Sequence, residues 1–215
     1  MSSAVALLSG GLDSTVAVAL WLERGNALSL CLTADYGQRS AAKELMTARA
    51  LAERFGAPWS AVPLPWLGEA AAVSGSALVD EAEQLPMGTP ERPGDDASAA
   101  RVWVPARNVV LLAVAAAYAD SSGADCVLAG FNREEAATFP DNSDDFAAAM
   151  TKALSFGTRD GVRVESPTSG MEKPEIAAAA LRLGIPRDAM WSCYGAGPDP
   201  CGRCESCLRS DRAFA

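Results

Sequence analysis

The amino-acid sequence predicts an α/β fold in which helices cover both faces of a parallel β-sheet and a small cysteine-rich segment follows. Three observations support this prediction. Short apolar runs alternate with helical patterns, a glycine-rich loop joins the first run to the first helix, and four of the six cysteines lie between residues 193 and 207. Strands that alternate with helices pair in parallel, because each right-handed crossover returns the chain to the same edge of the sheet.

The first part of the chain is predicted to form a βαβαβ series. Its apolar runs are short, as in strands, and its longer segments carry apolar residues at helical spacing. We predict strands at Ala4–Leu8, Ala27–Thr33 and Trp59–Pro63, and helices at Ser14–Arg24 and Ala41–Phe55. Gly56 and Pro58 follow the second helix, and both residue types commonly end a helix.

A long stretch from Leu64 to Ala100 shows no periodicity and is rich in proline, glycine and acidic residues. We interpret it as a mobile loop or lid, and the alternative is an insertion tolerated at the surface. Order is predicted to resume at Val102–Pro105, followed by a helix at Val109–Asp120, a strand at Asp125–Ala129, a helix at Phe146–Leu154, a strand at Val162–Glu165 and a helix at Pro174–Leu183. Residues 1–190 are thus predicted to form one domain, on which the cysteine segment 191–215 packs.

Composition and charge limit the classes of function. The chain is 49% hydrophobic and can bury a core, but no run approaches the roughly 18 uncharged apolar residues of a membrane helix. The N-terminus lacks the basic stretch of a signal peptide, so we expect a soluble, cytoplasmic protein with no membrane partner. The net charge of −9 disfavours nucleic acid as a partner, because such interfaces depend on clustered Lys and Arg.

The chain contains no histidine. This excludes Ser-His-Asp and Cys-His catalysis and removes histidine as a metal ligand. A general base must therefore be a carboxylate, Lys, Tyr, Cys or the substrate itself. Cys31 and Cys126 lie in apolar, strand-like runs, which predicts small buried thiols without a chemical role.

The stretch Ser9–Ser14, SGGLDS, lies where the first strand is predicted to end and the first helix to begin. In open α/β sheets, ligands bind at this edge. Gly10 and Gly11 would let the backbone approach an anion, and the helix N-terminus adds unpaired N–H groups and the positive end of its dipole. The loop is not a Walker P-loop, which requires a lysine. The alternative is a tight turn in which Asp13 or Ser14 caps the helix.

The last cysteines follow the spacing C-x7-C-x2-C-x2-C and are Cys193, Cys201, Cys204 and Cys207. CxxC turns place two thiolates on one ion, and four thiolates complete the closed tetrahedron of a structural zinc site. An iron–sulfur cluster is the main alternative, although ferredoxin runs continue C-x3-C-P and the matching position here is Asp211. Disulfides are disfavoured in a cytosolic chain, and a redox CxxC needs only one pair. We predict one structural Zn²⁺ per chain.

Four stretches of the chain, in this order, resemble one known family. They are LSGGLDST (Leu8–Thr15), DYGQR (Asp35–Arg39), VPARN (Val104–Asn108) and the cysteine array. The first is similar to the pyrophosphate loop of the PP-loop ATP pyrophosphatase superfamily, whose Rossmann-like fold is that of the adenine nucleotide alpha hydrolases. Together the four look like the 7-cyano-7-deazaguanine synthase family, and the resemblance extends from Val5 to Leu208.

The resemblance implies an ATP- and Mg²⁺-dependent ligase. Such an enzyme activates the carboxylate of 7-carboxy-7-deazaguanine as an adenylate and releases pyrophosphate. Ammonia then gives an amide, and a second activation dehydrates the amide to the nitrile, a precursor of queuosine and archaeosine. The resemblance further implies a homodimer whose partners are these small molecules rather than nucleic acid.

The resemblance also implies particular site residues. ATP would bind along the loop and first helix, at Leu8, Ser9, Gly10, Gly11, Leu12, Asp13, Ser14, Thr15, Val16, Ala17 and Val18. Adenylation needs positive charge at the α-phosphate, where negative charge builds in the transition state. The candidate catalytic residues are Asp13, Ser14, Arg107, Lys152 and Lys173. The candidate substrate residues are Tyr36, Gln38, Arg39, Asn108, Glu135, Phe139 and Asp141. Lys173 and Glu175 match a Lys-x-Glu of the family, and a helix cap is the alternative role for Glu175.

The chain departs from the family pattern at two places. The substrate-side loop of the family is close to D-x-S-G-Y-P-D-C-R, whereas Glu135–Ser143 is EAATFPDNS. Ser143 thus replaces an arginine that could pair with a carboxylate or phosphate, and Ser40 replaces a histidine. These changes keep open a divergent relative that stops at an amide, for example by joining the deazaguanine to a protein or another amine.

Two further alternatives come from other classes of protein. A sulfur-inserting tRNA ligase would want a catalytic cysteine pair, an iron–sulfur cluster and a basic face, and the acidic net charge counts against it. A non-catalytic zinc- and nucleotide-binding protein should tolerate loss of Asp13 or Ser14. The intact loop counts against this second alternative.

Overall fold

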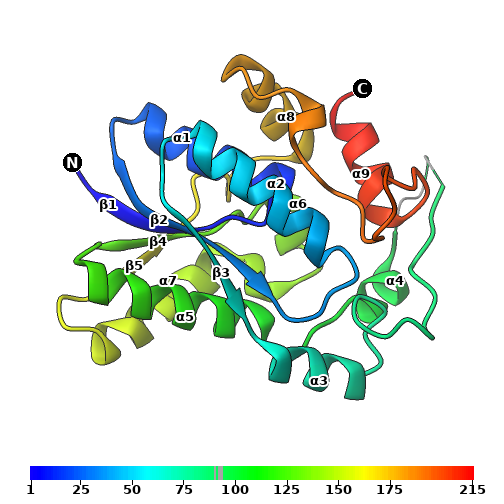
Figure 1. Ribbon diagram of the computed structural model, residues 1–215, viewed down its shortest axis with the longest axis horizontal. Coiled ribbons are helices and arrows are strands. Elements are labelled where there is room, and N and C mark those ends of the chain that lie inside the picture. Colours follow the sequence, from blue (N-terminus) through cyan, green and yellow to red (C-terminus); the bar gives the residue numbers. More distant parts are fainter. Residues whose placement is uncertain (90, 92–93) are drawn as a thin grey trace.

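A parallel five-stranded sheet lies at the centre of the computed structural model, which describes residues 1–89, 91 and 94–215 apart from the side chain of Asp96 (Figure 1). The strand order is β3-β2-β1-β4-β5. The strands are β1 Ser3–Leu7, β2 Ala27–Asp35, β3 Trp59–Pro63, β4 Cys126–Leu128 and β5 Arg163–Glu165. β1 pairs with β2 on one side and with β4 on the other, so the order of strands reverses beside it. An open α/β sheet forms its ligand crevice at this reversal.

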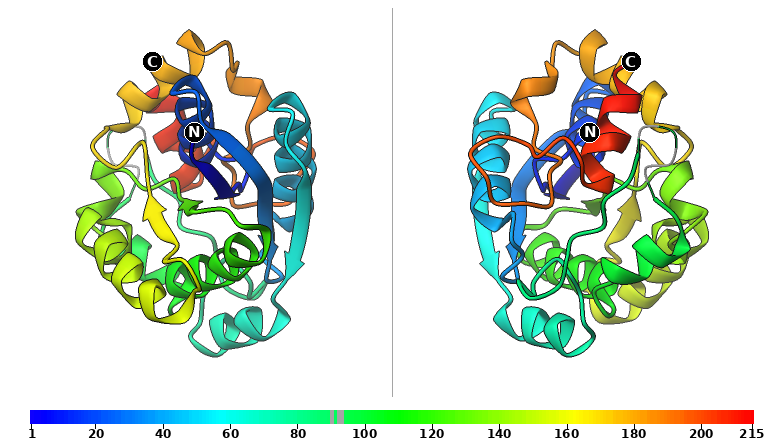
Figure 2. Two further views of the ribbon diagram at one scale, coloured as in Figure 1. Left: turned by 90° about the vertical axis from the view of Figure 1, so that its left-hand side faces the viewer. Right: turned by 90° about the vertical axis from the view of Figure 1, so that its right-hand side faces the viewer.

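Helices cover both faces of the sheet, which confirms the predicted α/β fold (Figures 1 and 2). One face carries α1 Leu12–Glu23, α2 Ala41–Arg54 and α8 Lys173–Arg182. The other face carries α5 Arg107–Ser122 and α7 Asp144–Gly157. The remaining short elements are α3 Pro65–Val73, α4 Asp96–Arg101, α6 Arg133–Ala136, η1 Pro140–Asn142, η2 Arg187–Ala189 and α9 Glu205–Ala213. Within the described ranges, no helix combines the length and apolar character needed to span a membrane.

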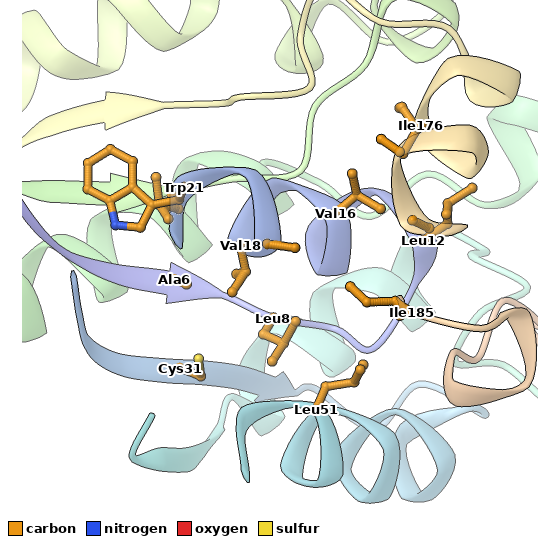
Figure 3. Close-up of a cluster of buried hydrophobic side chains, with 14 of the residues drawn as sticks. Ala6, Leu8, Leu12, Val16, Val18, Trp21, Cys31, Leu51, Ile176 and Ile185 are labelled. Atoms are coloured by element: carbon orange, nitrogen blue, oxygen red, sulfur yellow. The ribbon is translucent and has the colours of Figure 1, made fainter. Parts of the chain in front are cut away.

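Each face of the sheet buries its own core. Ala4 and Ala6 of β1 point to the α1 side, and Val5 points to the α5 side. Figure 3 shows the first core, where Leu8, Val16, Trp21, Leu51 and Ile176 are among the side chains that gather around α1. A strand buried on both faces has a continuous apolar sequence, and this explains why the strand runs were recognisable. The buried thiols of Cys31 and Cys126 lie in this same core, as predicted.

The segment 64–100 is more ordered than its sequence pattern suggested. Residues 90, 92 and 93 of it lie outside the described residues, but α3 begins directly after β3. Pro65 starts α3 without cost, because the first N–H of a helix needs no intrahelical partner. Gly68 lets α3 approach the backbone of Tyr36, since a Cβ at residue 68 would lie 1.9 Å from the carbonyl oxygen of Tyr36. Whether the rest of the segment is a lid stays a prediction.

The cysteine segment lies beyond the carboxyl ends of the strands (orange to red in Figure 1). It is fixed there by backbone contacts with the loop that contains Pro86 and Met87. Met87 and Cys204 form an antiparallel bridge, and the N–H of Glu205 donates to the carbonyl of Pro86. α9 also packs on α8, which places the end of the chain beside the first core.

Candidate active site

The loop after β1 presents backbone rather than side chains. Gly10 has φ +81°, and a Cβ there would lie 3.0 Å from Thr47, so glycine suits this position. Gly11 is the N-cap of α1, and no side chain caps the helix. The alternative in which Asp13 or Ser14 is the N-cap is therefore wrong, and α1 begins at Leu12, earlier than predicted. The N–H groups of its first turn remain available for an anion.

Two further features shape this loop. The hydroxyls of Ser9 and Ser14 lie 3.0 Å apart, and the N–H of Ser9 donates to Ser14 Oγ at 3.2 Å. Behind the loop, Gly130 follows β4, and a Cβ on it would lie 2.4 Å from the backbone nitrogen of Ser14. The end of β4 can therefore approach the first turn of α1 only because residue 130 is glycine.

An ion cluster around a buried lysine lies beside the first turn of α1. Lys173 Nζ donates to Asp13 Oδ2 and to Glu135 Oε1, each at 2.6 Å, and the lysine side chain is only 9% exposed. Lys173 is the first residue of α8 and Glu135 lies in α6, so three separate elements meet here. The structure brings these three predicted site residues together.

The charges of this cluster depend on one another. Burial raises the pKa of Asp13 above its usual range, although Lys173 opposes the rise. Burial also acts to raise the pKa of Glu135, but there the Lys173 ammonium prevails and the pKa is lowered. Burial alone would lower the pKa of Lys173, and the two carboxylates raise it instead. Lys173 is therefore charged at neutral pH.

VPARN places Arg107 and Asn108 at the start of α5 through a strained residue. Ala106 has φ +52°, a left-handed conformation that costs a non-glycine residue about 1 kcal/mol. The half-buried Arg107 side chain faces the hydroxyl of Tyr36 and the carboxylate of Asp141. Asn108 Nδ2 donates to the carbonyl of Asp141 at 3.0 Å. Because α5 begins at Arg107, earlier than predicted, both side chains lie on its first turn at the strand-end edge.

Two adjoining cavities meet at this cluster. The first, of about 270 Å³, lies over the ends of β1, β2 and β4 and has Ser9, Gly11, Asp13 and Ser14 in its wall. The second, of about 230 Å³, extends toward the cysteine segment. Asp13, Arg107 and Glu135 line both cavities, as do Ser9 and Gly11 of the glycine loop. The loop and the ion cluster thus border two adjoining compartments, each of which could hold part of a small-molecule ligand.

Most of the predicted substrate residues line the cavities, but Arg39 does not. Tyr36, Gln38, Asn108, Glu135, Phe139 and Asp141 all line one or both cavities. Gln38 bonds the N–H of Tyr36 and the carboxylate of Glu44, and so orders the wall. Arg39 instead donates to the carbonyls of Asp80 and Glu83, away from the cavities.

Lys152 and Glu175 also lie outside the site, and Gly10 and the buried Thr15, Val16, Ala17 and Val18 of α1 line neither cavity. Lys152 is exposed on α7, where its Nζ lies 4.7 Å from the ring centre of Phe156. Glu175 accepts a hydrogen bond from the N–H of Glu172 in the capping box of α8. Lys152 therefore lies outside both cavities, and Glu175 has the helix-cap role.

Sequence reasoning missed several residues of the second cavity. They are Glu44, Trp103, Trp191, Tyr194 and Arg209. The rings of Trp103 and Phe139 are nearly parallel, 15° apart in plane with centres 6.1 Å apart. Trp103 directly precedes VPARN, and Trp191, Tyr194 and Arg209 lie within or beside the cysteine array, so proximity to a motif was the available signal for these four. Glu44 lies on α2, and only the fold brings it to the cavity.

The four cysteine sulfurs form one cluster in which all ligand atoms lie within 4.8 Å of one another. The sulfurs of Cys193 and Cys204 are 4.0 Å apart, as are those of Cys201 and Cys207. A zinc–sulfur distance of about 2.3 Å places the sulfurs of a tetrahedron about 3.8 Å apart, so this donor set fits one ion. Backbone N–H groups of Gly195 and Cys204 also point at the sulfurs, at 3.3 Å.

The fold and the site define an α/β protein with a glycine loop before an uncapped helix, a lysine–carboxylate cluster and a cluster of four cysteine sulfurs. A family model described as Queuosine biosynthesis protein QueC matches residues 3–215. The chain therefore belongs to the QueC family, which confirms the resemblance found in its motifs.

Similar proteins cover almost the whole chain. The 7-cyano-7-deazaguanine synthase of Pelotomaculum thermopropionicum is 46% identical over 213 residues, covering 97% of this chain and 95% of the relative. That of Methanosarcina mazei is 41% identical over 218 residues, covering 98% and 93%. Among solved structures, NMN synthetase from Francisella tularensis has a TM-score of 0.50 at 15% identity and covers 99% of this chain and 83% of its own. This last likeness concerns the fold alone.

Proposed function

We propose that this chain is an ATP-dependent 7-cyano-7-deazaguanine synthase of queuosine-type biosynthesis. It converts 7-carboxy-7-deazaguanine and ammonium to the nitrile through an adenylate and an amide, and it releases AMP and pyrophosphate. Relatives with this name align along 97% of the chain, including the glycine loop and the cysteine segment, and this supports the proposal.

The observation that carries the proposal is a buried lysine beside an uncapped helix N-terminus. The first-turn N–H groups of α1 would bind the departing pyrophosphate, as helix N-termini bind anions. Lys173, 2.6 Å from Asp13, would supply positive charge where the α-phosphate is attacked. Arg107, at the junction of the two cavities, would help to neutralise the same charge.

The residues also fit the magnesium ion that ATP chemistry requires. Asp13 Oδ1 is buried and has no hydrogen-bond partner within the part of the chain that the structure describes. Carboxylate oxygens are preferred magnesium ligands, and Mg²⁺ at Asp13 would satisfy this atom. The ion would offset the phosphate charge, and Asp13 would fix its position.

We propose that the cysteine cluster holds one Zn²⁺. With four thiolate ligands the site is closed, so the metal would stabilise the cysteine segment and take no part in the reaction. Elemental analysis of the purified protein is expected to find one zinc per chain. Iron with a visible absorption band would mean an iron–sulfur cluster instead.

Product analysis tests the proposed function directly. The pure protein is incubated with 7-carboxy-7-deazaguanine, ammonium, ATP and Mg²⁺, and the products are measured by mass spectrometry. We expect the nitrile together with AMP and pyrophosphate. No ATP turnover with this acid would refute the proposal.

A second function is favoured by the altered loop. Ser143 replaces the family arginine, and here its hydroxyl caps α7 by accepting the N–H of Phe146 at 3.1 Å. A relative that stops at the amide would accumulate it without nitrile in the same experiment. That result would direct the search toward an acceptor amine.

We further propose that the protein is a cytoplasmic homodimer that acts on small molecules and not on nucleic acid. Sedimentation equilibrium is expected to give twice the chain mass. A monomer that turns over at the full rate would contradict the dimer.

A further inference from the structure

The two cavities offer few positive charges for the anions they would bind. Among the described residues, the cationic side chains that line them are Arg107, Lys173 and Arg209. Lys173 is held between two carboxylates, and Arg107 faces Tyr36 and Asp141. Only Arg209 has no role in the site as described so far.

Arg209 is held on one edge and open on the other. Its Nε and Nη2 both donate to Oε1 of Glu205, at 3.0 and 2.5 Å. Its Nη1 makes no hydrogen bond with any described residue. The Arg209 side chain is 21% exposed and that of Glu205 only 4%. A guanidinium fixed by a buried carboxylate is preorganised to bind an anion with its remaining N–H groups.

The position of Arg209 is fixed by the cysteine segment. It lies on α9, whose N-cap is Cys204 and whose first turn contains Cys207, so the cysteine cluster fixes the helix. Arg209 also interacts electrostatically with Glu135, which Lys173 contacts at 2.6 Å. Arg209 therefore lines the same cavity as the ion cluster.

From these contacts we infer that Arg209 binds the carboxylate of the substrate acid, an inference that rests on the proposed function. Arg209 takes the place of the arginine that the family pattern has at Ser143, and it reaches the cavity from a different element. The contact favours the acid over the neutral amide, because only the acid carries the charge that the guanidinium pairs with. The cysteine-bound helix thus recognises substrate as well as supporting the fold.

The test compares the acid with the amide. In Arg209→Met, the Kd and KM for 7-carboxy-7-deazaguanine are expected to rise at least 10-fold. The Kd for the neutral 7-amido-7-deazaguanine and the KM for ATP are expected to change less than about threefold, since neither contact uses the lost charge. Arg209→Lys should recover part of the acid affinity. Arg212→Met on the same helix, which loses only an ion pair with Glu134, is the matched control.

Calorimetric titration gives the affinities, and metal content equal to that of the wild type shows that the segment is folded. Equal weakening of acid and amide binding would mean that Arg209 only supports the cavity, and unchanged acid affinity would remove it from recognition. Either result overturns the inference while the wild type still makes nitrile. A wild type that neither binds nor converts the acid would refute the proposed function, and the inference would fail with it.

Discussion

The two compartments of the site are built from different parts of the chain. The proposed nucleotide end is one contiguous loop of backbone, where Gly10, Gly11 and the start of α1 leave N–H groups available. The proposed substrate end consists of side chains from separate elements, namely Arg107, Glu135, Phe139, Lys173, Tyr194 and Arg209. A site made of backbone is damaged by adding atoms, and a site made of side chains is damaged by removing them. The variants below test this contrast.

The largest effect is expected at the lysine that joins the two ends. Lys173→Met removes the charge proposed to act at the α-phosphate, and kcat/KM for AMP formation is expected to fall about 1,000-fold. The variant should also lose about 3 kcal/mol of unfolding free energy, because Asp13 and Glu135 then face each other unpaired. Lys152→Met on the outer face of α7 is the control, with activity within twofold of the wild type. Similar losses in both variants would mean that the site is wrongly placed.

At the glycine loop, one added methyl group is expected to disturb both the fold and ATP binding. Gly130→Ala would place Cβ 2.4 Å from Ser14 N and 2.6 Å from Ser14 Cα, and backbone atoms cannot move away independently. We expect a loss of about 1–3 kcal/mol in unfolding free energy and an increase in the KM for ATP of about 10-fold. Gly157→Ala, with open space around the new Cβ, should change the unfolding free energy by less than about 0.5 kcal/mol. A Gly130→Ala variant with wild-type stability and wild-type KM for ATP would contradict the view that this end of the site is damaged by added atoms.

The side-chain end should be sensitive to acid. The pKa of Glu135 is lowered on folding, since Lys173 outweighs the effect of burial. A carboxyl with a lowered pKa stabilises the fold above its unfolded pKa of about 4.3, and this contribution is lost as the pH falls through the folded pKa. The stability difference between the wild type and Glu135→Gln is therefore expected to be largest near neutral pH and to shrink below about pH 4.

Urea unfolding at a series of pH values measures this difference. Asp13 has the opposite effect on the pH dependence of stability, because burial raises its pKa. Both proteins contain Asp13, so the comparison isolates Glu135. A difference that stays constant from neutral pH to acid would show that Glu135 gains nothing from Lys173.

The smallest effect is expected at the strained alanine before α5. Ala106→Gly relieves a φ of +52°, while glycine adds freedom to the unfolded chain, and the two effects partly cancel. We expect a gain of about 0.5 kcal/mol, or about 1–2 °C in Tm by calorimetry, with activity unchanged. Destabilisation by the glycine would mean that the alanine methyl group makes a contact worth more than the strain.

The sequence predicted most of the sheet because its strands form short apolar runs, which are continuous in β1 and β4, where both faces are buried. It did not predict α3, since Pro65 and Gly68 look like helix breakers when their positions in the helix are unknown. Pro65 lies at the start of the helix, where it is tolerated, and Gly68 allows a close contact with Tyr36. Neither the position of Pro65 in the helix nor the contact of Gly68 can be read from the local sequence pattern.

The same limit applies to the site. The glycine loop and the cysteines were identified from spacing, because each motif is contiguous and its chemistry depends on residue type. Lys173 was suggested by family resemblance, but its pairing with Asp13 across 160 positions required the fold. Arg209 lies next to a recognised motif and was missed, because nothing local indicates that α9 turns this residue toward the cavity.

The hydrogen bond from Trp191 N–H to the carbonyl of Gly10, 2.9 Å long, links the glycine loop to the cysteine segment. The two residues are 181 positions apart (191 − 10), so during synthesis the loop leaves the ribosome long before the residue that holds it is made. The central strand β1 likewise needs β4, made more than 100 residues later, as its second neighbour. A nascent chain therefore cannot complete the glycine loop before Trp191 is made. Capture of the proposed zinc by the cysteine segment would then make metal supply a late step in producing active enzyme.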